Sequence, residues 1–182
     1  MDSLAAHLLI AGPTLIDPNF ARTVVLIAAH SEEGAMGVVL NRPSETAVTE
    51  AAPELDELVG DDDEPVFAGG PVQPEGVIVL AEFDEPGEAA ALVLGDIGFL
   101  AAGEETVAPP GGTRRARVFA GHAGWGPGQL ESELERDDWI VEPAETEDLF
   151  ALEPSGLWGA VLERKGGRYA LLARMPLDPS MN

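Results

Sequence analysis

Short apolar segments, each ended by glycine or proline, most restrict what this chain can fold into. Residues 23–29 are β-branched and apolar, and a second apolar run, 35–40, follows the turn at residues 33–34. An uncharged run of this length is typical of a strand buried on both faces. Two such runs joined by a short glycine turn predict a hairpin. Residues 7–11 predict a further short strand that ends at Gly12-Pro13.

The rest of the chain mixes strand and helix patterns without strict alternation. Residues 49–59 carry apolar side chains at helical spacing, with Thr49 as the expected N-cap. Further strands are expected at 66–68, 77–80, 116–120 and 139–141, and further helices at 128–137, 145–152 and 156–165. We therefore predict an α/β fold in which residues 1–182 form a single compact domain, with a mixed β-sheet flanked by helices.

Charge argues against a nucleic-acid partner. The chain has 33 acidic and 10 basic residues, a formal net charge of −23, and no Lys or Arg between residues 43 and 113. Affinity for nucleic acid comes largely from Lys and Arg that neutralise phosphates. The segment 114–117 carries three arginines and could form a small basic face. Our preferred interpretation is a charged sheet edge that discourages strand pairing.

Several other classes are excluded by what the sequence lacks. Without cysteine there is no disulfide, thiolate metal site or cysteine nucleophile. The apolar runs are far shorter than the roughly 20 residues of a membrane-spanning helix, and the start lacks the positive charge of a signal peptide. The acids at 61–64 are consecutive, unlike the alternating ligands of a calcium loop. We expect a cytoplasmic protein with no membrane association, no metal and no cofactor.

A glycine-rich segment, 121–128, is predicted to form a loop between a strand and a helix. Glycines let backbone amides approach a ligand, and the following helix start offers free N–H groups to an anion. His122 is expected to end the strand beside this loop, and Trp125 is either a stacking platform or a cover on the core. Backbone turning and core packing are the alternative to ligand contact here.

Polar side chains at two other turns are candidate ligand contacts. Arg22 could pair with Asp17 or hold an anion as a bidentate donor. Asn41 and Arg42 end the third strand and could form a recognition pair, or simply cap the loop.

The acids of the helix at 128–137 could provide acid/base catalysis, which needs two carboxylates in one cleft. Glu131 and Glu135 share a helical face, and the simpler interpretation is a solvated surface. One enzymatic alternative is a hydrolase that uses His122 with Asp17 or Glu131.

In order along the chain stand Asp17-Pro18-x-Phe20-x-Arg22-Thr23, Asn41-Arg42-Pro43, Gly69-Gly70-Pro71-Val72 and Gly121-x-Ala123-Gly124-Trp125-x-x-Gly128-Gln129-Leu130-Glu131. This ordered set resembles the AlgH/YqgE family of small bacterial proteins, from about residue 5 to the C-terminus. The resemblance implies a single α/β domain and carries no catalytic mechanism. Some members are described as transcriptional regulators. His122 and the low basic content depart from the family, which argues against histidine chemistry and direct operator binding.

We predict a non-enzymatic regulatory or binding protein that recognises a small anionic ligand or a protein partner. A regulator acting directly on DNA is a second alternative, disfavoured by the charge of −23. The segments 17–22, 41–43, 69–72 and 121–129 are expected to meet at one surface hollow. The candidate ligand-binding residues are Asp17, Arg22, Asn41, Arg42, Gly70, Pro71, His122, Gly124, Trp125 and Gln129.

Overall fold

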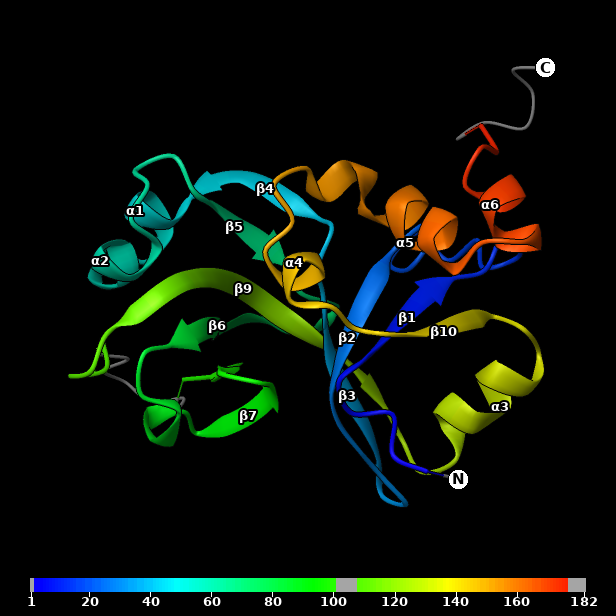
Figure 1. Ribbon diagram of the computed structural model, residues 1–182, viewed down its shortest axis with the longest axis horizontal. Helices are drawn as coiled ribbons and strands as arrows, with labels where there is room; N and C mark the ends of the chain where they lie inside the picture. Colours follow the sequence, from blue (N-terminus) through cyan, green and yellow to red (C-terminus); the bar gives the residue numbers. More distant parts are fainter. Residues whose placement is uncertain (1, 101–107, 177–182) are drawn as a thin grey trace.

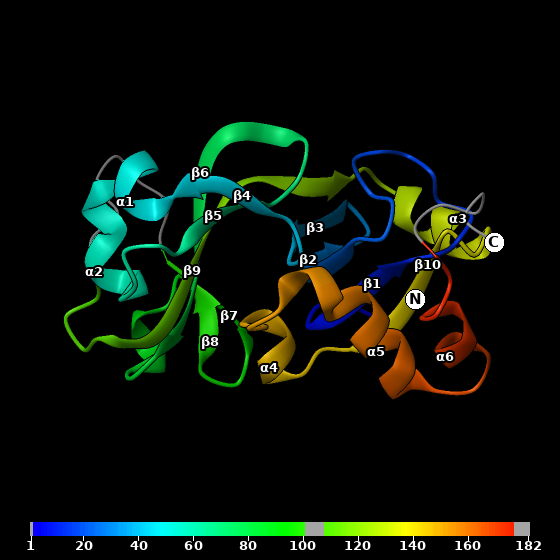
Figure 2. The ribbon, with the colours of Figure 1, turned by 90° about the horizontal axis from the view of Figure 1, so that it is seen from above.

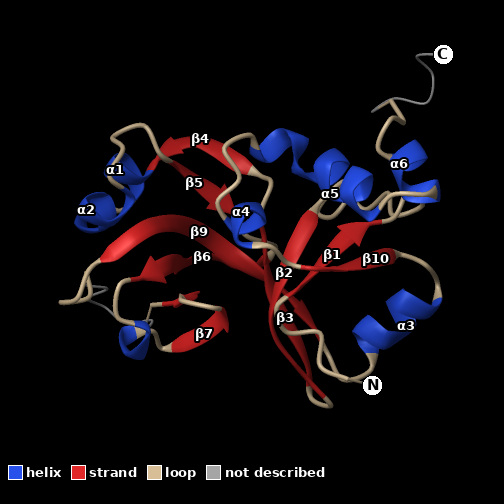
Figure 3. Cartoon of the chain, in the orientation of Figure 1, coloured by secondary structure: helices blue, strands red, loops and turns tan. Residues whose placement is uncertain are grey.

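In the computed structural model, which describes residues 2–100 and 108–176, the strands join into one ten-stranded sheet (Figures 1 and 3). Its main order is β10-β1-β2-β3-β9-β6-β8-β7, and β5 connects β4 to β9. Most pairs are antiparallel, and β5 runs parallel to β9, so the sheet is mixed as predicted. The strands are β1 His7–Ala11, β2 Val24–Ser31, β3 Gly34–Val39, β4 Pro43–Ala47, β5 Pro65–Ala68, β6 Val72–Phe83, β7 Ala91–Leu94, β8 Ile97–Phe99, β9 Thr113–Trp125 and β10 Trp139–Pro143.

The helices are short and lie around the sheet, which completes a single compact α/β domain. They are α1 Val48–Ala51, α2 Asp56–Val59, α3 Gln129–Glu135, α4 Thr146–Leu149, α5 Leu157–Lys165 and α6 Arg168–Leu172. Helices α3, α5 and α6 lie at the end of the molecule that holds β1 and β10, and α1 and α2 lie at the opposite end (Figures 1 and 2). No helix in the described ranges has the length and apolar character needed to cross a membrane.

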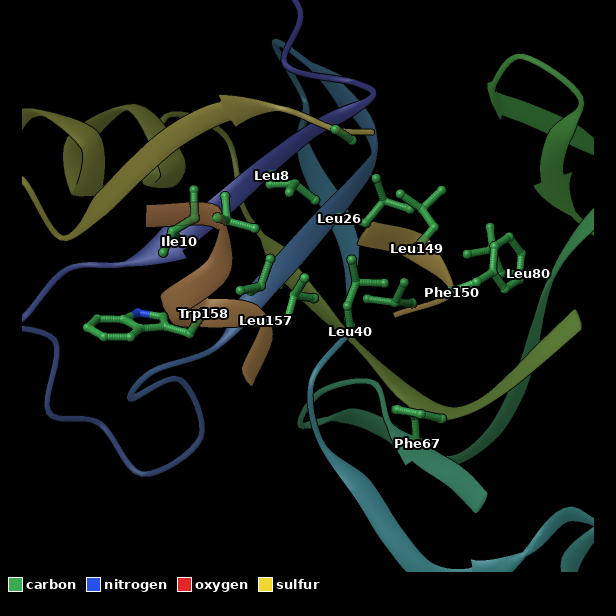
Figure 4. Close-up of a cluster of buried hydrophobic side chains, with 14 of the residues drawn as sticks. Leu8, Ile10, Leu26, Leu40, Phe67, Leu80, Leu149, Phe150, Leu157 and Trp158 are labelled. Atoms are coloured by element: carbon green, nitrogen blue, oxygen red, sulfur yellow. The ribbon is translucent and has the colours of Figure 1, made fainter. Parts of the chain in front are cut away.

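Strand β1 and the first half of β2, residues 24–27, are buried on both faces, as their apolar sequences predict. Alternate side chains point to opposite faces of a strand. Leu8 and Leu26 therefore pack in one core cluster, while Leu9 and Val25 pack in another. Helix α5 covers the first face, where Trp158 lies at one end of the cluster and Leu80 at the other (Figure 4).

The second half of the sheet has its own core. Val79 and Phe83 of β6 pack with Val118 of β9 against apolar side chains of α1 and α2, including Val48 and Leu58. These two helices replace the single helix predicted at 49–59. Pro53 interrupts that segment because proline lacks the N–H that a continuing helix needs. Thr49 lies inside α1 rather than at its N-cap, which is Ala47.

Strand β9 corrects the prediction of a loop at 121–128. The strand continues to Trp125, because Gly37 pairs with Ala123, and Ala35 with Trp125, in the ladder with β3. Only residues 126–128 connect β9 to α3. Strand pairing and the burial that accompanies it outweigh the low strand propensity of these glycines.

Residues 114–117 lie in β9, where they pair with β6 on one side, and the ladder with β5 on the other side begins only at Phe119. The arginines of this segment pair with carboxylates of the acidic middle of the chain. Arg115 Nε lies 2.7 Å from Glu82 Oε2, and the buried Arg117 places Nε 3.3 Å from Glu64 Oε1. The acidic run at 61–64 therefore contributes Glu64 to an ion pair.

Candidate functional site

The segment between β1 and β2, residues 12–23, borders three cavities, and we call it the β1–β2 loop. Its conformation is set locally by two polar side chains. The Asp17 carboxylate accepts a hydrogen bond from the backbone N–H of Asn19 at 2.8 Å, and the Thr23 hydroxyl donates to the carbonyl of Phe20 at 2.7 Å. Asp17 thus forms the kind of side-chain turn for which aspartate is favoured.

Asn41 and Arg42, which follow β3, bind the backbone of the β1–β2 loop. Asn41 Nδ2 donates to the carbonyl of Arg22 at 2.9 Å, and its Oδ1 accepts from the N–H of Val24 at 2.9 Å. Arg42 donates to the carbonyls of Pro18 at 2.8 Å and Ala21 at 3.1 Å. The two side chains proposed as a recognition pair therefore position this loop.

Arg22 ties the same loop to the segment after α6. Its Nη2 donates to the carbonyls of Met175 at 2.8 Å and Pro176 at 2.7 Å, and its guanidinium lies 4.5 Å from the centre of the Trp158 ring. Arg22 forms no ion pair with Asp17. Of the two possibilities raised by the sequence, pairing with Asp17 is wrong.

Phe20 connects the β1–β2 loop to a buried tryptophan pair. Its ring lies 6.3 Å from that of Trp125 and 5.7 Å from that of Trp139. Both indole N–H groups donate to one oxygen, Glu133 Oε2, at 2.8 Å. Gln129 extends the network, because its Nε2 donates to Glu133 Oε1 at 3.0 Å. Trp125 is 6% exposed and belongs to the core, so it is not a stacking platform.

Gly70 and Pro71 lie where the turn between β5 and β6 crosses β9. Gly70 has a φ of +150°, and a Cβ there would come 2.2 Å from the carbonyl carbon of His122. In the ladder between β6 and β9, His122 stands opposite Val72. Gly124 stands opposite Met36 of β3. The glycines of this crossing thus permit close backbone approach.

The smallest of the three cavities, about 120 Å³, brings together members of three predicted segments. Asn19, Arg42, Gly70 and Pro71 line it. His122, Gly124, Trp125 and Gln129 are not among its lining residues. The segments 17–22, 41–43 and 69–72 therefore meet, and 121–129 contributes support beneath them rather than lining.

The constellation proposed for a hydrolase is not assembled in residues 2–100 and 108–176. The carboxylate of Glu131 bonds to His30, with Nε2 and Oε1 2.9 Å apart, and not to His122. The Asp17 carboxylate is engaged with Asn19. His30 also accepts the backbone N–H of Leu4 at Nδ1, 3.0 Å away. The sequence assigns no function to His30, because its hydrogen bond with Glu131 can be recognised only in the folded structure.

The largest of these three cavities, about 420 Å³, opens between the β1–β2 loop, β10 and the α5–α6 pair. Pro13 and Thr14 form its wall on the loop side, and the charged or aromatic side chains around it are Asp137, Trp139, Lys165, Arg168 and Tyr169. A neighbouring cavity of about 270 Å³ shares Pro13 and is lined by Ile16, Arg22, Trp158 and Met175 among others. None of the residues at the largest cavity was predicted. The sequence signal that marks them is the pair of bases flanking Gly166-Gly167, between two helices.

Two cations at the largest cavity differ in their electrostatic partners. Lys165 Nζ lies 2.8 Å from Glu142 Oε2 and also donates to the carbonyl of Val141 at 2.9 Å. Arg168 forms no ion pair with a described carboxylate, and its Nη2 donates to the hydroxyl of Tyr169 at 3.0 Å. That hydrogen bond, followed by the nearby charge of Tyr169 and of Asp137, raises the pKa of Arg168 above its ordinary value.

Most of the cations that form no ion pair within the described ranges lie at the β1–β2 loop or beside it. Ion pairs with carboxylates, within the described part of the chain, involve Arg114, Arg115, Arg117, Arg136, Arg164 and Lys165. The other four of the ten basic residues are Arg22, Arg42, Arg168 and Arg174. Arg22 lies in the loop, Arg42 binds it, Arg168 borders the cavity beside it, and Arg174 precedes the carbonyls that Arg22 binds. No group of three or more His, Asp or Glu side chains within 2–100 and 108–176 could hold a metal ion.

Comparison with known proteins agrees with this architecture. A sequence model described as AlgH-like matches residues 8–170. A UPF0301 protein of Streptomyces coelicolor is 44% identical, with 100% of this chain and 97% of that protein covered, and one of Thermobifida fusca is 42% identical, with 99% and 96% covered.

Two solved structures have similar folds. A crystal structure of a protein from Corynebacterium diphtheriae matches with a TM-score of 0.82 and 29% identity, covering 96% of this chain and 94% of that one. The solution structure of the AlgH protein from Pseudomonas aeruginosa matches with a TM-score of 0.70 and 34% identity, covering 97% and 96%. None of these four names states an activity, a ligand or a partner. On the sequence and the fold together, this chain belongs to the AlgH-like family.

Proposed function

We propose that this protein binds a small ligand carrying a negatively charged group, in the 420 Å³ cavity beside the β1–β2 loop. The observation that carries the proposal is the distribution of cations. In a chain of net charge −23, three of the four arginines without a carboxylate partner among the described residues lie in this loop, bind it or border the cavity beside it. An uncompensated cation near the mouth of a cavity attracts anions and fixes their orientation.

The size and lining of this cavity suit a small molecule. Its volume of about 420 Å³ lies within the usual range of small-molecule sites, roughly 300–1,000 Å³. Apolar side chains such as Ile140 and Leu172 line it together with polar and charged groups in about equal share. Because Glu142 already compensates Lys165, we assign the contact with the negative group of the ligand to Arg168.

We propose that the predicted residues serve this site indirectly. Arg22, Asn41 and Arg42 act as positioning residues, because they hold the loop whose Pro13 and Thr14 form the wall of the cavity. The loop would also be stabilised by the aromatic contacts and hydrogen bonds that link Phe20, Trp125, Glu133 and Gln129. Gly70 and Pro71 border only the 120 Å³ hollow, which would admit no more than a small ion.

We propose binding rather than catalysis because the acids offered as partners for His122 are engaged elsewhere. Glu131 is bonded to His30, and Asp17 to the backbone of Asn19. A role as a DNA-contacting regulator remains disfavoured by the net charge, since the four available arginines are few against 33 acids.

The test is a calorimetric and thermal-shift screen of small carboxylates and phosphates, with Arg168→Ala beside the wild type. Arg114→Ala is the matched control, because Arg114 is an exposed arginine that pairs with Asp96 far from the cavity. A ligand at about 100 times its Kd should add about 2.7 kcal/mol to the free energy of unfolding. We expect Arg168→Ala to lose this stabilisation and Arg114→Ala to keep it. If no anion stabilises the wild type, or if Arg168→Ala binds as the wild type does, the proposal fails.

A further inference from the structure

The charges that face the 420 Å³ cavity are not all positive. Three charged side chains line it: Lys165, Arg168 and Asp137. Lys165 is compensated by Glu142 at 2.8 Å. Arg168 and Asp137 form no ion pair with any residue that the structure describes, and the Asp137 carboxylate accepts no hydrogen bond there. The cavity therefore offers one cation and one anion that lie near enough to interact but form no ion pair with each other or with another described residue.

Asp137 is held firmly in the turn between α3 and β10. Its backbone N–H donates to the carbonyl of Leu134 at 3.1 Å, and its φ is +59°. Its own carbonyl packs so closely on Gly12 that a Cβ there would come within 2.7 Å of the oxygen. The neighbouring Asp138 also accepts the N–H of Gly12, at 2.7 Å. The backbone of Asp137 is therefore fixed on both sides at the cavity wall, where its exposed carboxylate is free to meet a ligand.

The remaining lining is largely apolar. Ile140 and Val141 come from β10, Leu172 from α6, and the Tyr169 ring lies 4.9 Å from the Arg168 guanidinium. A ligand that fits this lining needs an apolar part as well as groups that match the two charges. The nearby carboxylate of Asp137 would repel a phosphate ester or a dicarboxylate, and such repulsion is a common source of specificity.

We propose that the cavity takes a zwitterion, specifically a free α-amino acid with an apolar side chain, whose carboxylate binds Arg168 and whose ammonium binds Asp137. This inference rests on the proposed function and narrows its ligand class. The apolar side chain of the amino acid lies against Ile140, Leu172 and Tyr169. The ammonium group distinguishes this ligand from a simple carboxylate, and Asp137 provides that discrimination.

The experiment compares each of three amino acids with two analogues, each of which lacks one of the two charged groups. Valine, leucine and phenylalanine are each titrated calorimetrically beside the same molecule without its amino group and the same molecule without its carboxylate. Hydrogen bonds to charged groups predict that loss of either group weakens binding about tenfold or more.

The variant Asp137→Asn removes the negative charge and should fold, because asparagine tolerates a positive φ. We expect it to weaken binding of the amino acid about tenfold and to leave binding of the deaminated acid unchanged or improved. Glu135→Gln is the matched control, since Glu135 is an exposed acid of α3 that does not line the cavity. That control should bind the amino acid as the wild type does.

The outcomes separate this inference from the proposed function. If carboxylates or phosphates bind through Arg168 but the amino acid gains nothing over its deaminated form, the inference is overturned and the proposed function stands. The same conclusion follows if Asp137→Asn leaves the preference for the amino group intact. If the amines alone bind as tightly as the amino acids, the inference is overturned, and if none of the amino acids, carboxylates and phosphates binds, both are overturned.

Discussion

A single carboxylate, that of Glu133, accepts the N–H groups of Trp125 and Trp139. Both tryptophans are at most 6% exposed, so neither N–H has ready access to water. An unpaired buried donor costs about 1–3 kcal/mol. We expect Glu133→Ala to lower the free energy of unfolding by about 2–3 kcal/mol, measured by urea denaturation.

Glu135→Ala, on the exposed side of the same helix, provides the control for this substitution. It should change the free energy of unfolding by no more than about 0.5 kcal/mol. Equal losses in the two variants would show that the double hydrogen bond contributes nothing specific.

The contact between His30 and Glu131 makes stability depend on acidity. Because His30 Nδ1 accepts the N–H of Leu4, the proton of the neutral ring resides on Nε2 and is donated to Glu131. A hydrogen bond within Glu131 itself, and then the bond from His30, lower the pKa of the carboxyl below its ordinary value of 4.5. The ionised form is thus favoured by folding, and its contribution is present above pH 4.5 and is lost as the pH falls through the lowered pKa.

Glu131→Gln mimics the protonated acid, so it tests this dependence. We expect its Tm to lie below that of the wild type at neutral pH, with the difference shrinking as the pH falls below 4.5. The Tm is measured in a series of buffers, with Glu135→Gln as the control that shows no such convergence. A difference that stays constant with pH would contradict the assigned role.

At this scale the sequence identified important residues but not their partners. Arg22, Asn41 and Arg42 were selected as polar side chains at turns, and each is engaged with backbone carbonyls or amides. Those partners lie up to 154 residues away, as for Arg22 and Pro176. Spacing along a chain contains no information about such contacts, because they depend on how the loops fold back together. Arg168 and Asp137 were missed for the same reason.

Among the elements, the crossing of the β5–β6 turn over β9 is the most demanding. A Cβ at Gly70 would overlap the backbone of His122, and the φ of +150° is one that other residues rarely adopt. We expect Gly70→Ala to lower the free energy of unfolding by about 3 kcal/mol or more. Urea denaturation gives the measurement.

Gly87→Ala is the control, because a Cβ at Gly87 meets no atom within 4 Å and its φ is not positive. Its effect should be about 1 kcal/mol or less. If both variants unfold at the same urea concentration, the close approach at Gly70 is not a constraint on the fold.

Elements with one dominant signal were predicted, and those with competing signals were not. Strands β1 and β2 are apolar on both faces, and the structure has them there. The end of β9 was mistaken for a loop because Gly121 and Gly124 weaken a strand in isolation, whereas pairing with β3 and β6 compensates for them. The prediction of a single helix at 49–59 was wrong because Pro53 interrupts the helical hydrogen bonds, and this effect outweighs the apolar spacing.

For the whole molecule, the excess of acids over bases should oppose compaction. With 33 acids and 10 bases, repulsion between like charges should exceed the stabilisation that the ion pairs provide. Added salt screens this repulsion, since the screening length falls from about 30 Å at 0.01 M to about 3 Å at 1 M. We expect the Tm to rise with NaCl, and to rise equally with KCl. A Tm that falls with both salts would mean that the ion pairs dominate.

The sequence predicted the overall class of the fold because composition and strand patterns are properties of the whole chain. It did not predict how charge is arranged in space. The described part of the stretch without bases, 43–113, contains β4 to β8, and Arg114, Arg115 and Arg117 of β9 pair with three of its acids, Glu64, Glu82 and Asp96. Bases that directly follow an acidic stretch in sequence thus lie beside it in the sheet.

Strand β9 hydrogen-bonds to β3 near its C-terminal end and to β5 and β6 along the rest. Both halves of the sheet therefore depend on β9, and without it neither half keeps all of its strand pairs. A protease cut or a gene truncation that divides the chain at this strand would leave two fragments with exposed strand edges, which are prone to pair with other chains.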